Sequence, residues 1–209
     1  RDPPPVPALA DLPRDLLDNE EGLTRFLDEH SFEVGFWAKN LDTGKTIERL
    51  ADRPVCLASI VKVFCVTELF RQKQEDDVDL GRKIDIPGRG PVSLGDAADL
   101  MIGQSDNAAT QALAEHLGRE NVNRIPALLH LEAMSDDILP EDGRLRQTLD
   151  KRVFGDRIAV PGLPQHGTAR GVARYFERLA NKEVISQAVS ADLLGFFSKH
   201  PKPFSDRYA

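Results

Sequence analysis

The sequence lacks several features that would place it in a specialised class. Two cysteines in 209 residues, Cys56 and Cys65, do not decide the redox compartment and are typical of small buried hydrophobic positions. No apolar run is long enough to span a bilayer. The net charge is -7, so no positive excess would attract nucleic acid or an anionic membrane. The overall composition, 41% hydrophobic and 29% charged, is typical of a globular protein, and the length allows one domain or two small, closely packed domains.

Patterns typical of metal, cofactor and phosphate sites are missing too. The five histidines form no His-x-x-x-His pair and the two cysteines form no Cys-x-x-Cys pair, so we expect neither a metal nor a cofactor. No glycine-rich phosphate loop is present. A Ser-His-Asp triad with His116 or His166 stays an alternative, although no Gly-x-Ser-x-Gly elbow supports it.

What stands out is an apolar segment over residues 58–70 that contains Ser59 and, three residues later, Lys62. A segment apolar nearly all round predicts a buried helix, on which residues three apart are neighbours. Burial favours the neutral form of a lysine, and a neutral amine beside a hydroxyl can take its proton. By itself Ser-x-x-Lys is a weak pattern, and an N-cap serine followed by a solvent-reaching lysine is then the better interpretation.

A second motif, Ser-Asp-Asn at residues 105–107, changes this interpretation. The order Ser-x-x-Lys and then Ser-Asp-Asn is typical of serine β-lactamases and penicillin-binding proteins. The sequence around both motifs, over residues 52–59 and 92–110, resembles the same superfamily. The similarity is to its class A β-lactamase-like branch and covers roughly residues 20–200.

The resemblance implies a role for each polar residue of the two motifs. Ser59 would attack a carbonyl carbon and become acylated, and Lys62 would receive its proton directly or through a water. Ser105 would relay a proton to the leaving nitrogen, and Asn107 would bind Lys62 or the substrate amide. The backbone N–H of Ser59 would serve as an oxyanion donor, because it lies at a helix N-terminus. Asp106 is expected to serve the loop rather than the chemistry.

The fold class implied is α+β, with a mostly helical domain packed on an antiparallel β-sheet. Apolar spacing predicts a helix around 14–29, and alternation over 32–38 before a turn at 40–44 predicts a hairpin whose first strand has one buried face. Ser93 and Gly118 predict a helix start and a helix end. Further helices are predicted over 107–117, 120–131 (with Pro126 as a kink or boundary), 168–176 and 190–198. We expect four parts: an extended arm over 1–13, the N-terminal part of the sheet domain over 14–57, the helical domain with both motifs over 58–185, and a final helix with the start of a return to the sheet over 186–209.

Two departures from the superfamily affect what the chain can do. The third motif, Lys-Thr-Gly, belongs on a strand after the last helix, whereas Lys-Thr occurs here only at residues 45–46. We expect that strand, two others and a closing helix to be missing, so that the sheet is incomplete or is completed by a second segment or chain. The Glu-x-x-x-Asn pair that supports deacylation in class A enzymes has no counterpart over residues 135–167.

Together these features predict a β-lactamase-like serine hydrolase whose substrate is a small-molecule or peptide-like amide, or a β-lactam. Three alternatives stay open: a D-alanyl-D-alanine peptidase or other penicillin-binding protein, a glutaminase-like amidase, and a non-catalytic module that keeps the fold and binds a ligand or partner. The resemblance also implies a bacterial protein that is periplasmic or secreted. Since the chain begins at Arg1, we expect an export signal or anchor to have preceded it.

Overall fold

The computed structural model describes residues 21–22, 25, 34–131 and 166–200. The expected arm over 1–13 lies outside these residues, as does most of the expected helix over 14–29. Nearly all of the loop over 135–167 lies outside them as well.

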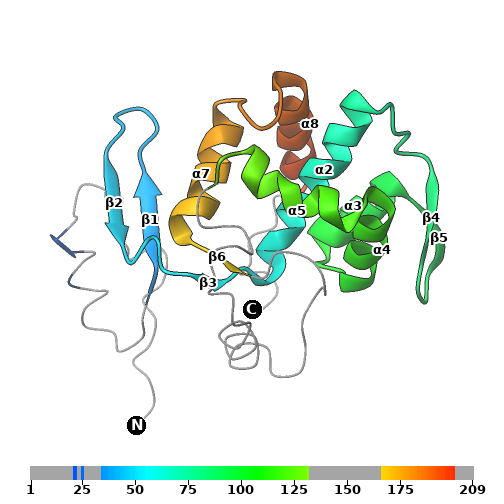
Figure 1. The fold of residues 1–209 in the computed structure, drawn as a ribbon, viewed down its shortest axis with the longest axis horizontal. Helices are drawn as coiled ribbons and strands as arrows, with labels where there is room; N and C mark the ends of the chain where they lie inside the picture. Colours follow the sequence, from blue (N-terminus) through cyan, green and yellow to red (C-terminus); the bar gives the residue numbers. More distant parts are fainter. Residues whose placement is uncertain (1–20, 23–24, 26–33, 132–165, 201–209) are drawn as a thin grey trace, which may run out of the picture.

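The described residues form an α+β fold in which helices dominate and the strands make small antiparallel sheets. In Figure 1 the β1–β2 hairpin lies at one end beside α7, the β4–β5 hairpin lies at the other end, and the helices fill the space between. In chain order the elements are β1 (Phe36–Lys39), β2 (Thr46–Arg49), β3 (Val55–Cys56), the 3₁₀ helix η2 (Ala58–Val61), α2 (Lys62–Glu75), β4 (Lys83–Ile86), β5 (Gly90–Ser93), α3 (Leu94–Gly103), α4 (Asn107–Leu117), α5 (Arg119–Leu128), β6 (His166–Gly167), α7 (Ala169–Ala180) and α8 (Gln187–Ser198).

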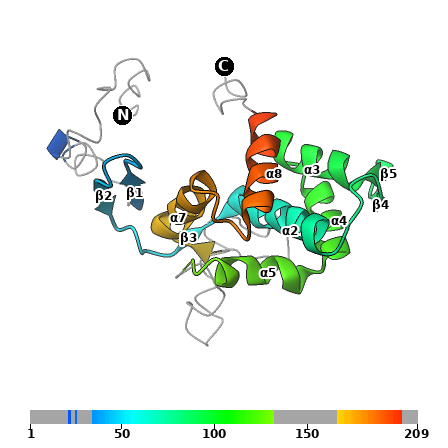
Figure 2. The ribbon, with the colours of Figure 1, turned by 90° about the horizontal axis from the view of Figure 1, so that it is seen from above.

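Helix α2 is the centre of the helical layer. It contacts α3, α4, α5 and α8, and Figure 2 shows it running between α8 and α5. Its apolar side chains, including Phe64, Val66 and Leu69, are buried. The prediction of a buried helix from the all-round apolar pattern is therefore confirmed, with one refinement: the first turn, which carries Ser59, is 3₁₀ rather than α.

Short polar residues and one glycine define the helix ends around α2. Ser93 Oγ accepts a hydrogen bond from the backbone N–H of Asp96 and so begins α3, as predicted. Gly118 ends α4 with a φ of 85°, a conformation that costs glycine little. Helix α5 follows at once and continues through Pro126, which is neither its start nor its end.

The predicted hairpin is present, with β1 and β2 paired antiparallel from Phe36 opposite Arg49 to Lys39 opposite Thr46. Its burial differs from the prediction. Every residue of β1 is half-buried, and in β2 only Ile47 is buried. A strand gains one buried face only when a layer covers it, and among the described elements β1 contacts α7 but no further strand.

The β4–β5 hairpin was not predicted. Residues 87–89 form its turn, and β5 starts at Gly90. Two four-residue strands with Pro91 and Gly90 at their junction carry too little alternation to be recognised as strands.

Candidate active site

The hydroxyl of Ser59 is exposed at the start of the central helix. Ser59 follows Ala58, whose φ of 46° is left-handed and so uncommon for a residue with a side chain. Leu57, two residues before Ser59, and Val61, two residues after it, are both buried. These two buried side chains hold a short turn whose serine is exposed. Ser59 does not cap the helix, since the N-cap residue of this turn is Leu57.

Lys62 is almost fully buried, with 2% of its surface exposed, so the alternative of a solvent-reaching lysine is wrong. Its Nζ donates to the carbonyl oxygen of Ser105 at 2.7 Å, to Ser105 Oγ at 2.8 Å and to Asn107 Oδ1 at 2.8 Å. Ser59 Oγ lies slightly farther away, at 3.3 Å. A buried amine is tolerated because polar partners surround it.

Two kinds of oxygen lie close to the amine of Lys62. The carbonyl oxygen of Ser105 and the amide oxygen of Asn107 can only accept, so each takes an N–H of the lysine. The hydroxyls of Ser59 and Ser105 also lie within hydrogen-bond distance of Nζ, and a hydroxyl can accept from an ammonium or donate to a neutral amine. A proton can therefore pass between the amine and these hydroxyls while the contacts with the Ser105 carbonyl and Asn107 stay in place.

The two serines are themselves in contact, with Ser59 Oγ 2.9 Å from Ser105 Oγ. A path from Ser59 through Ser105 to Lys62 thus has two steps of 2.9 and 2.8 Å, each shorter than the direct distance of 3.3 Å between Ser59 and Lys62. Hydroxyl groups at these distances can pass a proton along a hydrogen-bonded chain.

Ser105 reaches Lys62 with two oxygens because its backbone is left-handed, with a φ of 55°. Such a conformation costs a non-glycine residue roughly 1–2 kcal/mol, and strained residues of this kind gather at functional sites. The loop that holds it, between α3 and α4, is fixed by the backbone N–H of Asp106, which donates to the carbonyl of Leu100 at 3.2 Å.

Asp106 stabilises this loop from outside the site. Its carboxylate accepts from the backbone N–H of Ala109 at 2.9 Å as the N-cap of α4, and it pairs with Arg89 at 2.8 Å. The N–H of Ala109, and then Arg89, hold the pKa of Asp106 below its usual value. The expectation that Asp106 serves the loop is confirmed, whereas Arg89, which comes from the β4–β5 turn, was not anticipated because that hairpin was missed.

Within the described ranges, no group of three histidine, cysteine or acidic residues lies close enough together to hold a metal ion. In the same part of the chain, no helix combines the length and the apolar character needed to cross a membrane.

The sequence pattern of the β-lactamase enzyme family matches residues 19–203. The chain belongs to this family. A comparison with curated protein sequences gives no match.

Solved β-lactamases share the fold. The β-lactamase of Sphaerobacter thermophilus DSM 20745 superposes with a TM-score of 0.69 at 21% identity, over 89% of this chain and 71% of that one. The β-lactamase of Chitinophaga pinensis DSM 2588 gives a TM-score of 0.68 at 14% identity, over 88% and 71%. The protein PBP-A gives 0.68 at 19% identity, over 91% and 71%, and a variant of PBP-A has been solved as an acyl-enzyme complex with penicillin G. The chain thus has the α+β fold of a β-lactamase-like serine hydrolase, and these solved chains extend beyond the part that it matches.

One feature of this β-lactamase fold was not anticipated from the sequence: an apolar groove of about 610 Å³ between β1 and α7. Its lining includes Ile60, next to Ser59, and the exposed side chains of Val55 and Phe176. An ion pair between Lys39 of β1 and Glu177 of α7 lies along it. The groove therefore runs along β1, whose one strand partner among the described residues is β2, and it reaches toward the site through Ile60.

Proposed function

We propose that the protein is a serine hydrolase that cleaves amide or β-lactam carbonyls through an acyl-enzyme on Ser59. The observation that supports this most strongly is the position of Lys62, buried and within hydrogen-bond reach of both serine hydroxyls. The match to the β-lactamase family supports the same class of reaction.

In the proposed first step, Ser59 Oγ attacks the substrate carbonyl carbon and a C–O bond forms as the serine loses its proton. The proton passes to Lys62, directly or through the hydroxyl of Ser105. The C–N bond then breaks, and Ser105 gives the leaving nitrogen a proton that is replaced from Lys62. Asn107 holds the amine in position through its contact of 2.8 Å, and the backbone N–H of Ser59 stabilises the oxyanion.

The experiment that tests this proposal is covalent labelling with a fluorescent penicillin, followed by gel and intact-mass analysis. The wild-type chain should acquire one adduct, and Ser59→Ala should acquire none. Ser198→Ala is the matched control, since Ser198 is also exposed but lies at the end of α8, and it should label like the wild type. Labelling that persists in Ser59→Ala would show that another residue is the nucleophile.

A second set of variants tests the role of the lysine. Lys62→Met keeps the length of the side chain and removes the amine, so labelling should fall by a factor of about 100 or more. An unchanged labelling rate in Lys62→Met would remove the lysine from the mechanism even if Ser59 stays the nucleophile.

We also propose that the edge of β1 that has no strand partner among the described residues accepts one more strand, an extended polypeptide segment with apolar side chains at alternate positions. An unpaired strand edge offers backbone N–H and C=O groups to such a segment, and the apolar groove beside it would take the side chains. Without that segment, residues 1–209 should self-associate and turn over little substrate. Ala38→Lys, which adds a charge to this edge, should reduce the association in sedimentation velocity. A stable monomer with full turnover would contradict the proposal.

Finally, we propose that the protein is periplasmic or secreted, as members of the β-lactamase family typically are. Cell fractionation of the producing organism, followed by immunoblotting, tests this, and recovery with cytoplasmic markers would refute it.

A further inference from the structure

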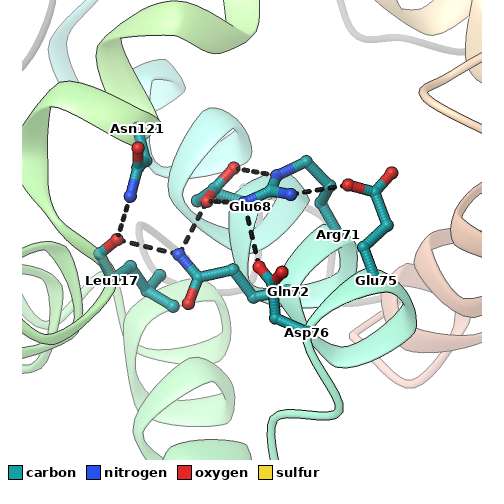
Figure 3. A network of polar contacts seen from close by, with 7 residues as sticks. All are labelled: Glu68, Arg71, Gln72, Glu75, Asp76, Leu117 and Asn121. Carbon is teal, nitrogen blue, oxygen red and sulfur yellow. Dashed lines mark hydrogen bonds and ion pairs between the residues drawn. The ribbon is translucent and has the colours of Figure 1, made fainter.

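A second polar network lies at the far end of α2 from Ser59. Glu68 is buried, with 1% of its side chain exposed, and its carboxylate accepts from Arg71 through two nitrogens at 2.8 Å each. Gln72 Nε2 also donates to Glu68, at 2.7 Å. Figure 3 shows that these side chains, one turn apart, orient the amide of Gln72 toward the neighbouring helix.

The amide of Gln72 binds the end of α4. Its Nε2 donates to the carbonyl oxygen of Leu117 at 2.8 Å, and Asn121 of α5 donates to the same oxygen at 2.8 Å (Figure 3). The last carbonyls of a helix have no partner within it, so these amides satisfy a group that would otherwise be unpaired and buried. The Leu117–Asn121 joint, where α4 ends and α5 begins, is closely packed as well, because a Cβ atom added to Gly118 would lie 2.9 Å from Asn121 Nδ2.

This network and the site lie at opposite ends of the same two helices. Lys62 and Gln72 are ten residues apart on α2, and Asn107 and Leu117 are ten residues apart on α4. Ten residues of helix span about 15 Å. One hydrogen bond of 2.8 Å joins the two helices near their starts, from Lys62 to Asn107, and another of 2.8 Å joins them near their ends, from Gln72 to Leu117. The segment between the two bonds therefore has the same length in both helices.

We infer that Gln72 is a positioning residue for acylation: it fixes how α2 lies along α4 and thereby holds Asn107 against Lys62. The inference rests on the proposed function of Ser59. Glu68 and Arg71 act indirectly: Arg71 holds the carboxylate of Glu68, and that carboxylate holds the Gln72 amide in the orientation that reaches Leu117. Removal of the hydrogen bond between Gln72 and Leu117 should let α4 shift along α2. A small displacement of a catalytic group can lower the reaction rate strongly.

The test compares two glutamines of α2. Gln72→Met removes the bond to Leu117 and keeps the side-chain length. Gln74→Met is the matched control, because Gln74 makes a bond of the same length, 2.8 Å, to Asp192 of α8, which carries no residue of the site. The first-order acylation rate constant at saturating fluorescent penicillin should fall about tenfold in Gln72→Met, with apparent affinity for the unreacted probe within about twofold. Gln74→Met should keep both values within about twofold of the wild type.

A double-mutant cycle separates positioning from loss of stability. In an Asn107→Ala background the group to be positioned is gone, so Gln72→Met should cause no further fall in rate. Two effects that multiply independently, or a Gln72→Met variant with a lower melting temperature and an unchanged rate, would overturn the inference.

Amide hydrogen exchange tests the same inference without any activity, so failure of the wild type to label refutes only the proposed function. The amides of Ala109 and Thr110 bond to Asp106 at the start of α4. They should exchange faster in Gln72→Met than in the wild type or Gln74→Met. Faster exchange confined to the Leu117–Asn121 joint would show a local effect and overturn the inference.

Discussion

The left-handed backbone of Ser105 leads to a prediction that separates the conformational strain at this residue from the contribution of its hydroxyl. Ser105→Ala and Ser105→Gly both remove the hydroxyl and with it the contacts to Ser59 and Lys62. The loss of those hydrogen bonds is common to both variants, so the difference between them reports on the backbone alone.

The size of that difference follows from the φ of 55° at Ser105. Alanine keeps the left-handed strain of about 1–2 kcal/mol, and glycine does not. Glycine also loses more conformational freedom on folding, which offsets about 0.4–1 kcal/mol of this gain. We therefore expect Ser105→Gly to be more stable than Ser105→Ala by about 0.5–1 kcal/mol, or roughly 1–4 °C in melting temperature for a chain of this size.

Urea denaturation with linear extrapolation measures this difference. Ser190 supplies the matched control, since it is buried within α8 and its hydroxyl bonds the backbone of Val184. There the order should reverse, with Ser190→Gly less stable than Ser190→Ala by about 1 kcal/mol, because glycine is unfavourable inside a helix. Both Ser105 variants should also label with penicillin far more slowly than the wild type.

An alanine variant at Ser105 as stable as the glycine variant, with the expected reversal at Ser190, would refute the reasoning. The left-handed turn would then store no strain, and the site would hold its serine at no cost to the fold.

Three further predictions concern charge and turnover. Asp106→Asn should keep the N-cap and lose the ion pair with Arg89, whereas Asp106→Ala loses both, at about 1 kcal/mol more. Since the pKa of Asp106 lies below 3.8, the advantage of the wild type over Asp106→Asn should be complete above pH 3.8 and vanish as the pH falls through the folded-state pKa, in denaturation curves over a pH series. Burial lowers the pKa of His116 below 6.5, so stability should decrease as the pH falls below 6.5, and His116→Gln should flatten that slope. An adduct on Ser59 should persist for hours in intact-mass spectra, because residues 135–167 contain no Glu-x-x-x-Asn pair for deacylation; rapid return to the unmodified mass would contradict this.

The sequence predicted the local part of the site better than the rest of the molecule. Ser59 and Lys62 are three apart on one helix, so helical geometry alone predicts their contact, and the structure has it. The contacts of Lys62 with Ser105 and Asn107 span more than 40 residues, and only the resemblance of the two motifs anticipated them. The catalytic roles of these residues stay predictions.

What the sequence did not predict depends on tertiary packing. Gln72 is an ordinary polar residue on a helix, and nothing in its neighbours indicates that it binds the end of α4. The half-buried β1 strand was expected to have a buried face, since alternation reports what a strand can bury and not which layer covers it. The β4–β5 hairpin, which brings Arg89 to Asp106, is too short to leave a pattern.

The pair of equal spans on α2 and α4 sets a rule for how these helices can change in length. One residue inserted between Lys62 and Gln72 would turn the later part of α2 by about 100° and lengthen it by about 1.5 Å, so the two ends could no longer both meet α4. Point substitutions leave the number of residues between the two hydrogen bonds unchanged, whereas a single insertion or deletion in either helix makes the two spans unequal. Changes in chain length should therefore be tolerated only outside residues 62–72 and 107–117, in the turns beyond the two hydrogen bonds.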